Sequence, residues 1–253
     1  MFRVVIPARF GSTRLPGKPL LPLAGKPMIQ WVYERARRSG AEQVIVATDD
    51  ERIAQRVREL GGEAVLTSAT HASGSDRIAE IVLREGWRDS DIVVNLQGDE
   101  PLMPEALIDQ VAALLAGHAS AELTTLSVPL DSVASLLDPN VVKVVTDAQQ
   151  RALYFSRAPI PWSREGAAHG LSSQRSCALA RRHLGLYAYR VAALLRLAAL
   201  PPSPLEQLEK LEQLRALEHG MDMRVAHAAV APGPDVNTAE DLSAVAALLQ
   251  AGR

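Results

Sequence analysis

The chain contains 253 residues, 47% of them hydrophobic, and carries a formal net charge of −2 at pH 7. This length predicts one large domain, and the lack of any run of eighteen apolar residues argues against a transmembrane helix. The single cysteine, Cys177, excludes an intrachain disulfide, and Pro7 and Arg9 interrupt the first apolar run before it reaches the length of a secretory signal. We therefore expect a cytoplasmic protein that does not associate with membranes.

The charge is unevenly distributed along the chain. Residues 1–38 contain eight cationic side chains and one acidic one, which gives this segment a net charge of +7 and leaves −9 for the rest. Such a local positive field favours a small anionic ligand over nucleic acid, which needs an extended basic surface. For Arg35, Arg37 and Arg38 a solvated helix face is the simpler explanation.

Predicted strands and helices alternate through the first 146 residues. Apolar runs predict strands at residues 3–6, 43–47, 63–66, 92–96, 123–128 and 141–146. Apolar spacing together with cap and stop signals predicts helices at 28–38, 51–60, 75–85 and 104–116. This order predicts an α/β fold with a doubly wound, mainly parallel sheet and helices on both faces.

The second part of the chain is less regular. Strands are predicted at 152–156, 184–189 and 225–230, and helices at 191–199, 205–219 and 239–250. The polar segment 160–176 is predicted to be an exposed, mobile loop. Within 205–219 a leucine recurs at every third position, which fits either a core stripe or a face shared with a second copy of the chain.

A cationic loop follows the first predicted strand. Residues 7–18 include Arg9, Arg14 and Lys18 and no acidic side chain. Open α/β sheets bind ligands beyond the carboxyl ends of their strands, and arginine and lysine together suit a polyphosphate. The glycine spacings of a P-loop and of a dinucleotide fingerprint are absent. The loop therefore indicates phosphate binding of another kind, the alternative being a surface loop with scattered cations.

Asp99 follows the apolar strand 92–96, at the same edge of the predicted sheet as the cationic loop. A carboxylate there suits Mg²⁺, a hard cation that completes its coordination with water and phosphate oxygens. Gly98 is expected to let the backbone approach a ligand closely. The alternative for Asp99 is a turn carboxylate that caps the next helix.

Two further segments combine ligand and cap signals. Ser73 and Arg77 lie where a predicted helix opens, in a position to hold a base or ribose or only to cap the helix. Asp235 and Asn237 are two residues apart, so an extended chain places both on one face, where either supplies a second oxygen to a metal. Capping of the last helix is an equally good explanation for Asn237.

A polar and aromatic face is predicted around the strand 184–189. His183 and Tyr187 share this face with a glycine and a second tyrosine, because side chains alternate along a strand. The face suits a polyhydroxylated acid, although a single histidine is more often structural. Arg157 and the helix-opening segment that contains Glu206 are additional polar candidates.

Together these motifs are recognisable. They are I-P-A-R at 6–9, S-T-R-L-P-G-K-P at 12–19, N-L-Q-G-D-E-P at 95–101, Y-F-S-R at 154–157, R-H-L-G-x-Y at 182–187 and P-S-P-L-E at 202–206. In this combination the chain resembles the 3-deoxy-manno-octulosonate cytidylyltransferases, or CMP-Kdo synthetases, a family of sugar nucleotidyltransferases. The matches are in order and span nearly the whole chain, whereas the cationic loop alone would fit any sugar nucleotidyltransferase.

The resemblance implies a fold, a reaction and an assembly. The fold is that of the nucleotide-diphospho-sugar transferases, a single domain over residues 1–253 with an inserted sugar-binding and dimerisation region at 152–222. The reaction joins CTP and 3-deoxy-manno-octulosonate (Kdo) to give CMP-Kdo and pyrophosphate, with Mg²⁺ as cofactor. It also implies a cytoplasmic homodimer that supplies CMP-Kdo for lipopolysaccharide biosynthesis.

The resemblance assigns roles by position. The residues implied in catalysis are Lys18, Arg14 and Asp99. Those implied in nucleotide binding are Pro7, Ala8, Arg9, Arg14, Lys18, Ser73, Arg77 and Gln97. Those implied in binding the acid sugar are Gln97, Arg157, His183, Tyr187 and Glu206. The metal ligands implied are Asp99 together with Asn237 or Asp235.

One position departs from the family pattern. The family usually has Val-Asp-Thr-Pro-Glu-Asp near the C-terminus, with the first aspartate as a metal ligand, whereas this chain has Asn237 there. An asparagine retains a carbonyl oxygen for the metal but removes one negative charge. Asp235 is then the alternative ligand.

The implied mechanism needs positioning more than covalent help. The anomeric hydroxyl of the sugar attacks the α-phosphorus of CTP, Mg²⁺ on Asp99 lowers the pKa of that hydroxyl, and Lys18 and Arg14 stabilise the leaving pyrophosphate. No protein general base is expected. Two alternatives remain, activation of another acid sugar such as a sialic acid and a non-catalytic nucleotide-binding regulator. The intact Gln97-Gly98-Asp99 argues against the regulator.

Overall fold

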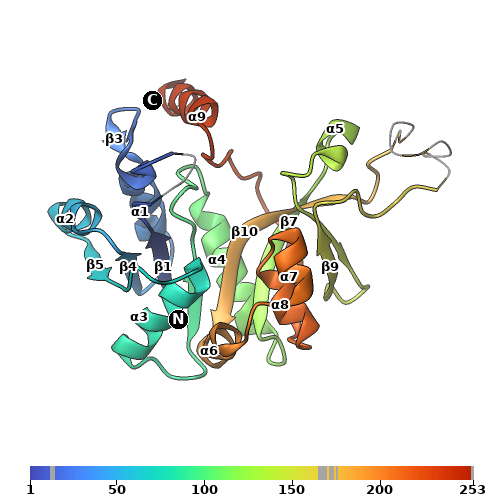
Figure 1. Ribbon diagram of the computed structural model, residues 1–253, viewed down its shortest axis with the longest axis horizontal. Helices are drawn as coiled ribbons and strands as arrows, with labels where there is room; N and C mark the ends of the chain where they lie inside the picture. The colour runs from blue at the N-terminus through green and yellow to red at the C-terminus, as the bar shows by residue number, and fades with distance from the viewer. Residues whose placement is uncertain (12–14, 165–169, 171–173, 175, 252–253) are drawn as a thin grey trace.

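A mixed β-sheet forms the centre of the computed structural model, which describes residues 1–11, 15–164, 170, 174 and 176–251. Among these residues nine strands join in one sheet, in the order β11-β7-β10-β6-β1-β4-β5, with β8 and β9 branching from β10 (Figure 1). The strands are β1 Arg3–Ala8, β4 Gln43–Thr48, β5 Glu63–Leu66, β6 Ile92–Asn95, β7 Leu123–Pro129, β8 Lys143–Thr146, β9 Ala152–Ser156, β10 Arg181–Arg190 and β11 Met223–His227.

The first half of the sheet is parallel and is covered on both faces. Strand β1 pairs in parallel with β4 and β6, and β4 pairs in parallel with β5. Residues of α1 (Met28–Arg38), α2 (Glu51–Glu59) and α4 (Glu105–Gly117) join one apolar cluster with Val4 and Ile6. Residues of α3 (Gly74–Glu85) join a second cluster with Val5. The predicted doubly wound sheet is therefore confirmed, since alternate residues of β1 enter different clusters.

The second half of the sheet is mainly antiparallel. Strand β10 lies between β6 and β7 and is antiparallel to both, while β11 pairs in parallel with β7. The register of β10 against β7 shifts between Leu184 and Tyr187, which marks a bulge. The hairpin of β8 and β9 continues from the start of β10. Part of the predicted inserted region 152–222 is thus an internal strand of the main sheet, and its sugar-binding and dimerisation roles stay predictions.

The single helix predicted over 205–219 is wrong. The chain forms α7 (Pro204–Glu209) and α8 (Gln213–Glu218) instead, because Lys210 adopts a left-handed conformation with φ 55° and ends α7. The leucines of the three-residue repeat separate accordingly. Leu208 is 80% exposed, whereas Leu211 and Leu214 are buried in the core.

Most other boundaries differ from the prediction by a few residues. The last predicted strand, 225–230, is β11 and begins two residues earlier. Helices α6 (Val191–Ala199) and α9 (Ala239–Ala251) are close to their predicted ranges. Not predicted were η1 (Lys18–Leu20), the small hairpin of β2 (Pro22–Leu23) and β3 (Lys26–Pro27), and α5 (Val133–Leu137). The loop predicted at 160–176 lies largely outside the described residues.

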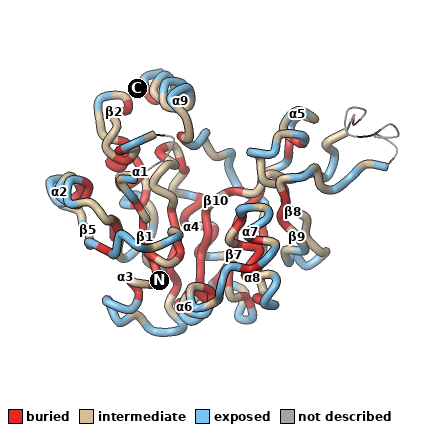
Figure 2. Tube along the Cα trace, viewed as in Figure 1, coloured by how far each residue is buried: buried red, intermediate tan, exposed pale blue. Residues whose placement is uncertain are grey.

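The C-terminal segment returns to the N-terminal part of the molecule. Helix α9 lies near the hairpin of β2 and β3 at the top of Figure 1, and Val245 and Leu249 of this helix share an apolar cluster with Leu23, Met28 and Trp31. Figure 2 shows that α9 is largely exposed while the central strands are buried. Within the described part of the chain no helix is long and apolar enough to span a membrane.

Candidate active site

Two adjoining cavities lie at the edge of the sheet where β1 and β6 end. The first has a volume of about 460 Å³ and the second about 820 Å³. Four residues line both cavities, and they are Gln97, Asp99, Glu212 and Asn237. Ligands bound in the two cavities would therefore meet at these side chains.

Cationic side chains line the first cavity near the end of β1. Arg9 and Lys18 are both lining residues, and Lys18 Nζ lies 2.7 Å from Asp99 Oδ2. Gly17 precedes the short helix η1 in a left-handed conformation, φ 67°, and a Cβ there would lie 3.1 Å from the ring of Phe10. This turn fixes the direction in which Lys18 leaves the backbone. Arg14, which the sequence analysis placed with these cations, lies outside the described residues.

The loop after β6 packs directly on the end of β1. A Cβ on Gly98 would lie 3.0 Å from the carbonyl oxygen of Pro7, which is tighter than nine in ten real Cβ contacts. The sequence analysis expected Gly98 to allow close approach of a ligand. The close contact in the structure is with the chain itself, so Gly98 brings Asp99 and the cationic loop together.

The segment before α9 reaches the same place. Val236 N donates a hydrogen bond to Asp99 O at 2.9 Å, and Asn237 Nδ2 donates to Asp235 Oδ2 at 2.5 Å. Thr238 caps α9, since its hydroxyl accepts from Asp241 N and Asp241 Oδ2 accepts from Thr238 N. The structure therefore brings together the three residues predicted as metal ligands.

The donor atoms in this group are carboxylate and amide oxygens, which suit a hard cation such as Mg²⁺. Among the residues that the structure describes, no three His, Cys, Asp or Glu side chains gather in the manner of a metal centre. A cation bound here would consequently need the amide of Asn237, and oxygens from its ligands, besides Asp99.

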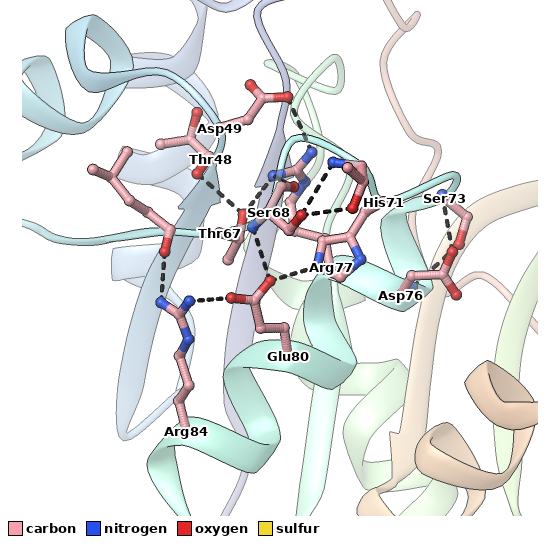
Figure 3. A network of polar contacts seen from close by, with 12 residues as sticks. Thr48, Asp49, Thr67, Ser68, His71, Ser73, Asp76, Arg77, Glu80 and Arg84 are labelled. Atoms are coloured by element: carbon pink, nitrogen blue, oxygen red, sulfur yellow. Dashed lines mark hydrogen bonds and ion pairs between the residues drawn. The ribbon is translucent and has the colours of Figure 1, made fainter.

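The opposite end of the first cavity lies beyond β4 and β5 and is built from a polar network (Figure 3). Ser73 caps α3 through a reciprocal capping box with Asp76. Arg77 is 3% exposed, and its guanidinium donates to Asp49 Oδ2 at 3.1 Å, to Ser68 O at 3.3 Å and to the hydroxyl of Thr67. Ser73 and Arg77 both line the cavity, but the contacts of Arg77 show that it also holds the cavity wall together.

Aromatic side chains occupy one side of the second cavity. The ring centroid of His183 lies 5.0 Å from that of Phe155 and 5.2 Å from that of Tyr187, which confirms that His183 and Tyr187 share a face. His183 Nε2 lies 3.0 Å from Thr125 Oγ1. Burial lowers the pKa of His183 to about 3, so the imidazole is neutral at physiological pH.

Two residues predicted in the acid-sugar site do not line either cavity. Arg157 Nε donates to Glu209 O at 2.6 Å and its Nη1 donates to Pro139 O at 2.9 Å. Glu206 completes a capping box with Ser203 and pairs with Arg215 at 2.5 Å. Both side chains are engaged in holding α7 and its neighbours, and their predicted contact with sugar stays a prediction.

Several charged residues that line the second cavity were missed by the sequence analysis, among them Arg182, Lys210 and Glu212. Glu212 lines both cavities, accepts a hydrogen bond from Ser75 Oγ at 3.3 Å, and has its pKa raised by burial. The only feature of the sequence that pointed to Glu212 was its charge, since it stands among the leucines of the helix predicted at 205–219. Arg182 precedes His183 in a motif already singled out, and its guanidinium has no hydrogen bond or ion pair with the described residues.

Comparison with known proteins places this geometry in context. The family model described as cytidylyltransferase matches residues 3–223. A protein of Thioalkalivibrio sulfidiphilus named 3-deoxy-manno-octulosonate cytidylyltransferase is 54% identical over 250 residues, with 99% of each chain covered. A protein of the same name from Pseudomonas fluorescens is 53% identical and covers 99% of this chain and 98% of its own.

Solved structures show the same similarity. The structure of a CMP:2-keto-3-deoxy-manno-octonic acid synthetase complexed with CTP matches with a TM-score of 0.89 and 41% identity, over all of both chains. A cytidylyltransferase from Leptospira borgpetersenii matches with a TM-score of 0.62 and 18% identity, over 98% of this chain and 86% of its own, which shows a shared fold.

Proposed function

This chain belongs to the cytidylyltransferase family, and on that premise we propose that it transfers CMP from CTP to Kdo, releasing pyrophosphate. The observation that carries the proposal is the pair of cavities that meet at Asp99 and Gln97. A transfer between two substrates requires their reacting atoms to be held side by side, which a shared boundary between two sites provides.

The first cavity is the nucleotide site. Arg9 and Lys18 bind the phosphate oxygens, and Lys18 leaves its ion pair with Asp99 to do so. The base extends toward the opposite end, which His71, Ser73 and Arg77 line. The match to a structure that contains CTP supports this assignment.

The second cavity is the acid-sugar site. His183 is neutral across the range in which the enzyme works, so it offers a hydrogen bond to a sugar hydroxyl and does not act as a cationic partner for the carboxylate. Tyr187 lies beside it, and Gln97 reaches the sugar from the boundary with the nucleotide site. Arg182 and Lys210 are cations of this cavity, and the charge of Arg182 acts on the buried Glu100 beside it.

We propose Mg²⁺ as the cofactor, held by Asp99 with Asn237 or Asp235 as the second protein ligand. When bound there, Mg²⁺ supplies a Lewis acid that offsets phosphate charge. The chain itself contributes orientation, because the hydrogen bond from Val236 N to Asp99 O fixes the ligand-bearing segments relative to each other. The replacement of a carboxylate by Asn237 reduces the negative charge that opposes the triphosphate.

We also propose a cytoplasmic homodimer that provides CMP-Kdo for lipopolysaccharide biosynthesis. Support for self-association comes from large apolar side chains in and near the region 152–222. Leu153 is 59% exposed, Leu179 is 88% exposed and Leu208 is 80% exposed. Their exposure within one stretch of the sequence is the support for this part of the proposal.

The decisive experiment measures pyrophosphate release from CTP and Kdo in the presence of Mg²⁺. Parallel reactions replace CTP by UTP, and Kdo by a sialic acid. Release that requires both CTP and Kdo supports the proposal. Pyrophosphate release with a sialic acid but not with Kdo would identify a sialic acid as the sugar substrate. Nucleotide binding without pyrophosphate release with either sugar would identify a non-catalytic regulator.

A further inference from the structure

Two separate segments of the chain form part of the wall of the second cavity. The first, called here the turn wall, comprises residues 138–142 before β8, and most of its residues line the cavity. The second, called the helix wall, comprises residues 210–213, where α7 ends and α8 begins, and all of its residues line the cavity. The cavity keeps its shape only if these two segments stay at a fixed distance from each other.

Lys143 directly follows the turn wall, at the start of β8, and its side chain is completely buried. Its Nζ donates hydrogen bonds to Asp138 O at 2.9 Å and to Arg157 O at 2.5 Å. Burial lowers the pKa of Lys143, and the charges of Asp138 and Glu209 act in the opposite direction. A lysine is rarely buried to this extent, because removing its charge from water is costly unless hydrogen-bond acceptors replace the water. Lys143 thus ties the turn wall to the residue that follows β9.

Arg157 is that residue, and its side chain continues the connection to the helix wall. Its Nη1 donates to Pro139 O in the turn wall at 2.9 Å. Its Nε donates at 2.6 Å to the carbonyl oxygen of Glu209, which directly precedes the helix wall. One guanidinium therefore bridges the two walls, and Lys143 holds the backbone from which this guanidinium extends.

Glu209 holds the same bridge from the end of α7, which lies beside β9 (Figure 1). Its carboxylate accepts from Ser156 Oγ at 2.6 Å and from Arg157 N at 2.9 Å. Hydrogen bonds that involve a charged group are the stronger kind, so both ends of this connection are firm. Lys143 and Glu209 thus hold Arg157 from two sides, although neither of them lines the first or the second cavity.

We propose that Lys143 and Glu209 are positioning residues of the acid-sugar site, which act through Arg157 to keep the turn wall and the helix wall at a fixed separation. The inference rests on the proposed function of the second cavity. A polyhydroxylated ligand gains affinity from several hydrogen bonds only when the groups around it are already in place. Of the described residues that line the first cavity, none is a hydrogen-bond partner of Lys143 or Glu209, so CTP binding does not depend on them.

The test measures KM and kcat for Kdo and, by calorimetry without sugar, the Kd for CTP. In Lys143→Met the KM for Kdo rises about tenfold, because two hydrogen bonds from a buried charged group are lost. The kcat and the Kd for CTP stay within about twofold of wild type, as expected when only sugar binding is weakened. Glu209→Ala raises the KM for Kdo about fivefold. Glu209→Gln retains most of the affinity for Kdo, since its amide oxygen still accepts from Arg157 N.

Glu218→Ala is the matched control. Glu218 is an exposed glutamate of α8 that accepts a hydrogen bond from Leu205 N at 3.2 Å, so its replacement removes a contact between α7 and α8 without reaching either wall. Its KM for Kdo stays at the wild-type value. If both Lys143→Met and Glu209→Ala left the KM for Kdo within about twofold of wild type, the inference would be overturned. Equal increases in the KM for Kdo and the Kd for CTP would also overturn it, and Glu209→Ala decides alone if Lys143→Met does not fold.

Hydrogen exchange followed by mass spectrometry examines the two walls without any substrate. In Glu209→Ala the amides of the turn wall and of the helix wall exchange faster than in wild type, whereas those of α1 keep the wild-type rate. Faster exchange in all three places, or in none of them, contradicts the inference. Because this measurement needs neither nucleotide nor sugar, it separates a failure of the inference from a failure of the proposed function, in which wild-type protein would release no pyrophosphate from CTP and Kdo.

Discussion

The two cavities differ in how their side chains are supplied. In the first cavity Asp99 lies in the loop after the parallel strand β6 and Lys18 begins η1, and their charged ends form an ion pair at the cavity wall. In the second cavity His183 and Tyr187 project from an antiparallel strand, and Glu212 lies at the start of a helix. The first cavity is built by strand ends and the second by strand register and helix packing.

The electrostatic character of the cavities differs in the same way. The Lys18–Asp99 pair is partly exposed, so a phosphate or a cation can take the place of either partner. In the second cavity burial dominates, and it lowers the pKa of His183 and raises that of Tyr187. A site for charged ligands that exchange partners thus adjoins a site whose buried imidazole and phenol groups, His183 and Tyr187, stay neutral. The following predictions test this contrast, beginning with the largest effect.

Replacement of Asp99 by asparagine should separate chemistry from binding. We expect turnover to fall about a thousandfold, because the charge that holds the metal is lost. Binding of CTP should change by less than about threefold, since Lys18 is freed from its ion pair and still bears its charge. Pyrophosphate release and calorimetry measure the two quantities. The control is Glu240→Gln, an exposed carboxylate in α9, and near-normal turnover of Asp99→Asn with Mg²⁺ would refute the metal assignment.

Replacement of Gly98 by alanine tests whether the first cavity depends on the packing of two loops. The added Cβ would meet the carbonyl oxygen of Pro7, which cannot rotate away, so the loops must separate by a few tenths of an ångström or more. We expect kcat/KM for CTP to fall about 10- to 100-fold. Gly11→Ala, in the loop after β1, should stay close to wild type, because a Cβ added there would have nothing within 4 Å. Equal effects of the two changes would exclude the packing explanation.

The neutral histidine of the second cavity should appear in the pH dependence of stability. The folded state holds His183 neutral down to about pH 3, whereas the unfolded chain takes up a proton near pH 6.5. The unfolded state therefore binds more protons below pH 6.5, and stability falls as the pH decreases toward 3. At pH 4.5 this loss is about 3 kcal/mol.

Denaturant unfolding of His183→Gln between pH 7 and pH 4.5 measures this loss. The free energy of unfolding of the variant should be lower than that of wild type at pH 7. This difference should become smaller on acidification, because glutamine does not titrate. In His227→Gln, a change at an exposed position, the free energy of unfolding should fall with decreasing pH as steeply as in wild type. If the free energy of unfolding of His183→Gln fell with pH as steeply as that of wild type, a group other than His183 would cause the loss of stability in acid.

The smallest expected effect concerns the break between α7 and α8. Lys210 has φ 55°, a conformation that costs less for glycine than for other residues. Lys210→Gly should therefore raise the free energy of unfolding by about 0.5 kcal/mol. Leu208→Gly, at an exposed position within α7, should lower it by about 0.5–1 kcal/mol. A loss of stability in Lys210→Gly would contradict the role of this residue as a helix stop.

The contrast between the cavities also explains what could be predicted from the sequence. The alternating elements, the doubly wound sheet and the convergence of Lys18 with Asp99 followed from the rule that parallel strands end at one edge. The break at Lys210 was not predicted, because the leucine repeat continues through it and a left-handed lysine has no sequence signal. Arg157 and Glu206 were assigned by resemblance, but backbone carbonyls and Arg215 engage them in this structure.

Glu212 and His71 were missed for a related reason. Each becomes a candidate only because the fold places it at a cavity, where Ser75 donates to Glu212 and Glu80 contacts His71. The sequence gives the order of the side chains, but it does not show which carboxylate contacts which hydrogen-bond donor. Those contacts become known only from the way the helices pack in the folded protein.

The hydrogen bond from Val236 to Asp99 has a consequence for the synthesis of the chain. The cationic loop and Asp99 leave the ribosome before Asn237, which follows Asp99 by 138 residues in the chain. N-terminal elements fold first during translation. A nascent chain can therefore assemble the parallel half of the sheet while the site still lacks its C-terminal wall. The cavity is complete only once this later segment has been synthesised and has folded back against Asp99.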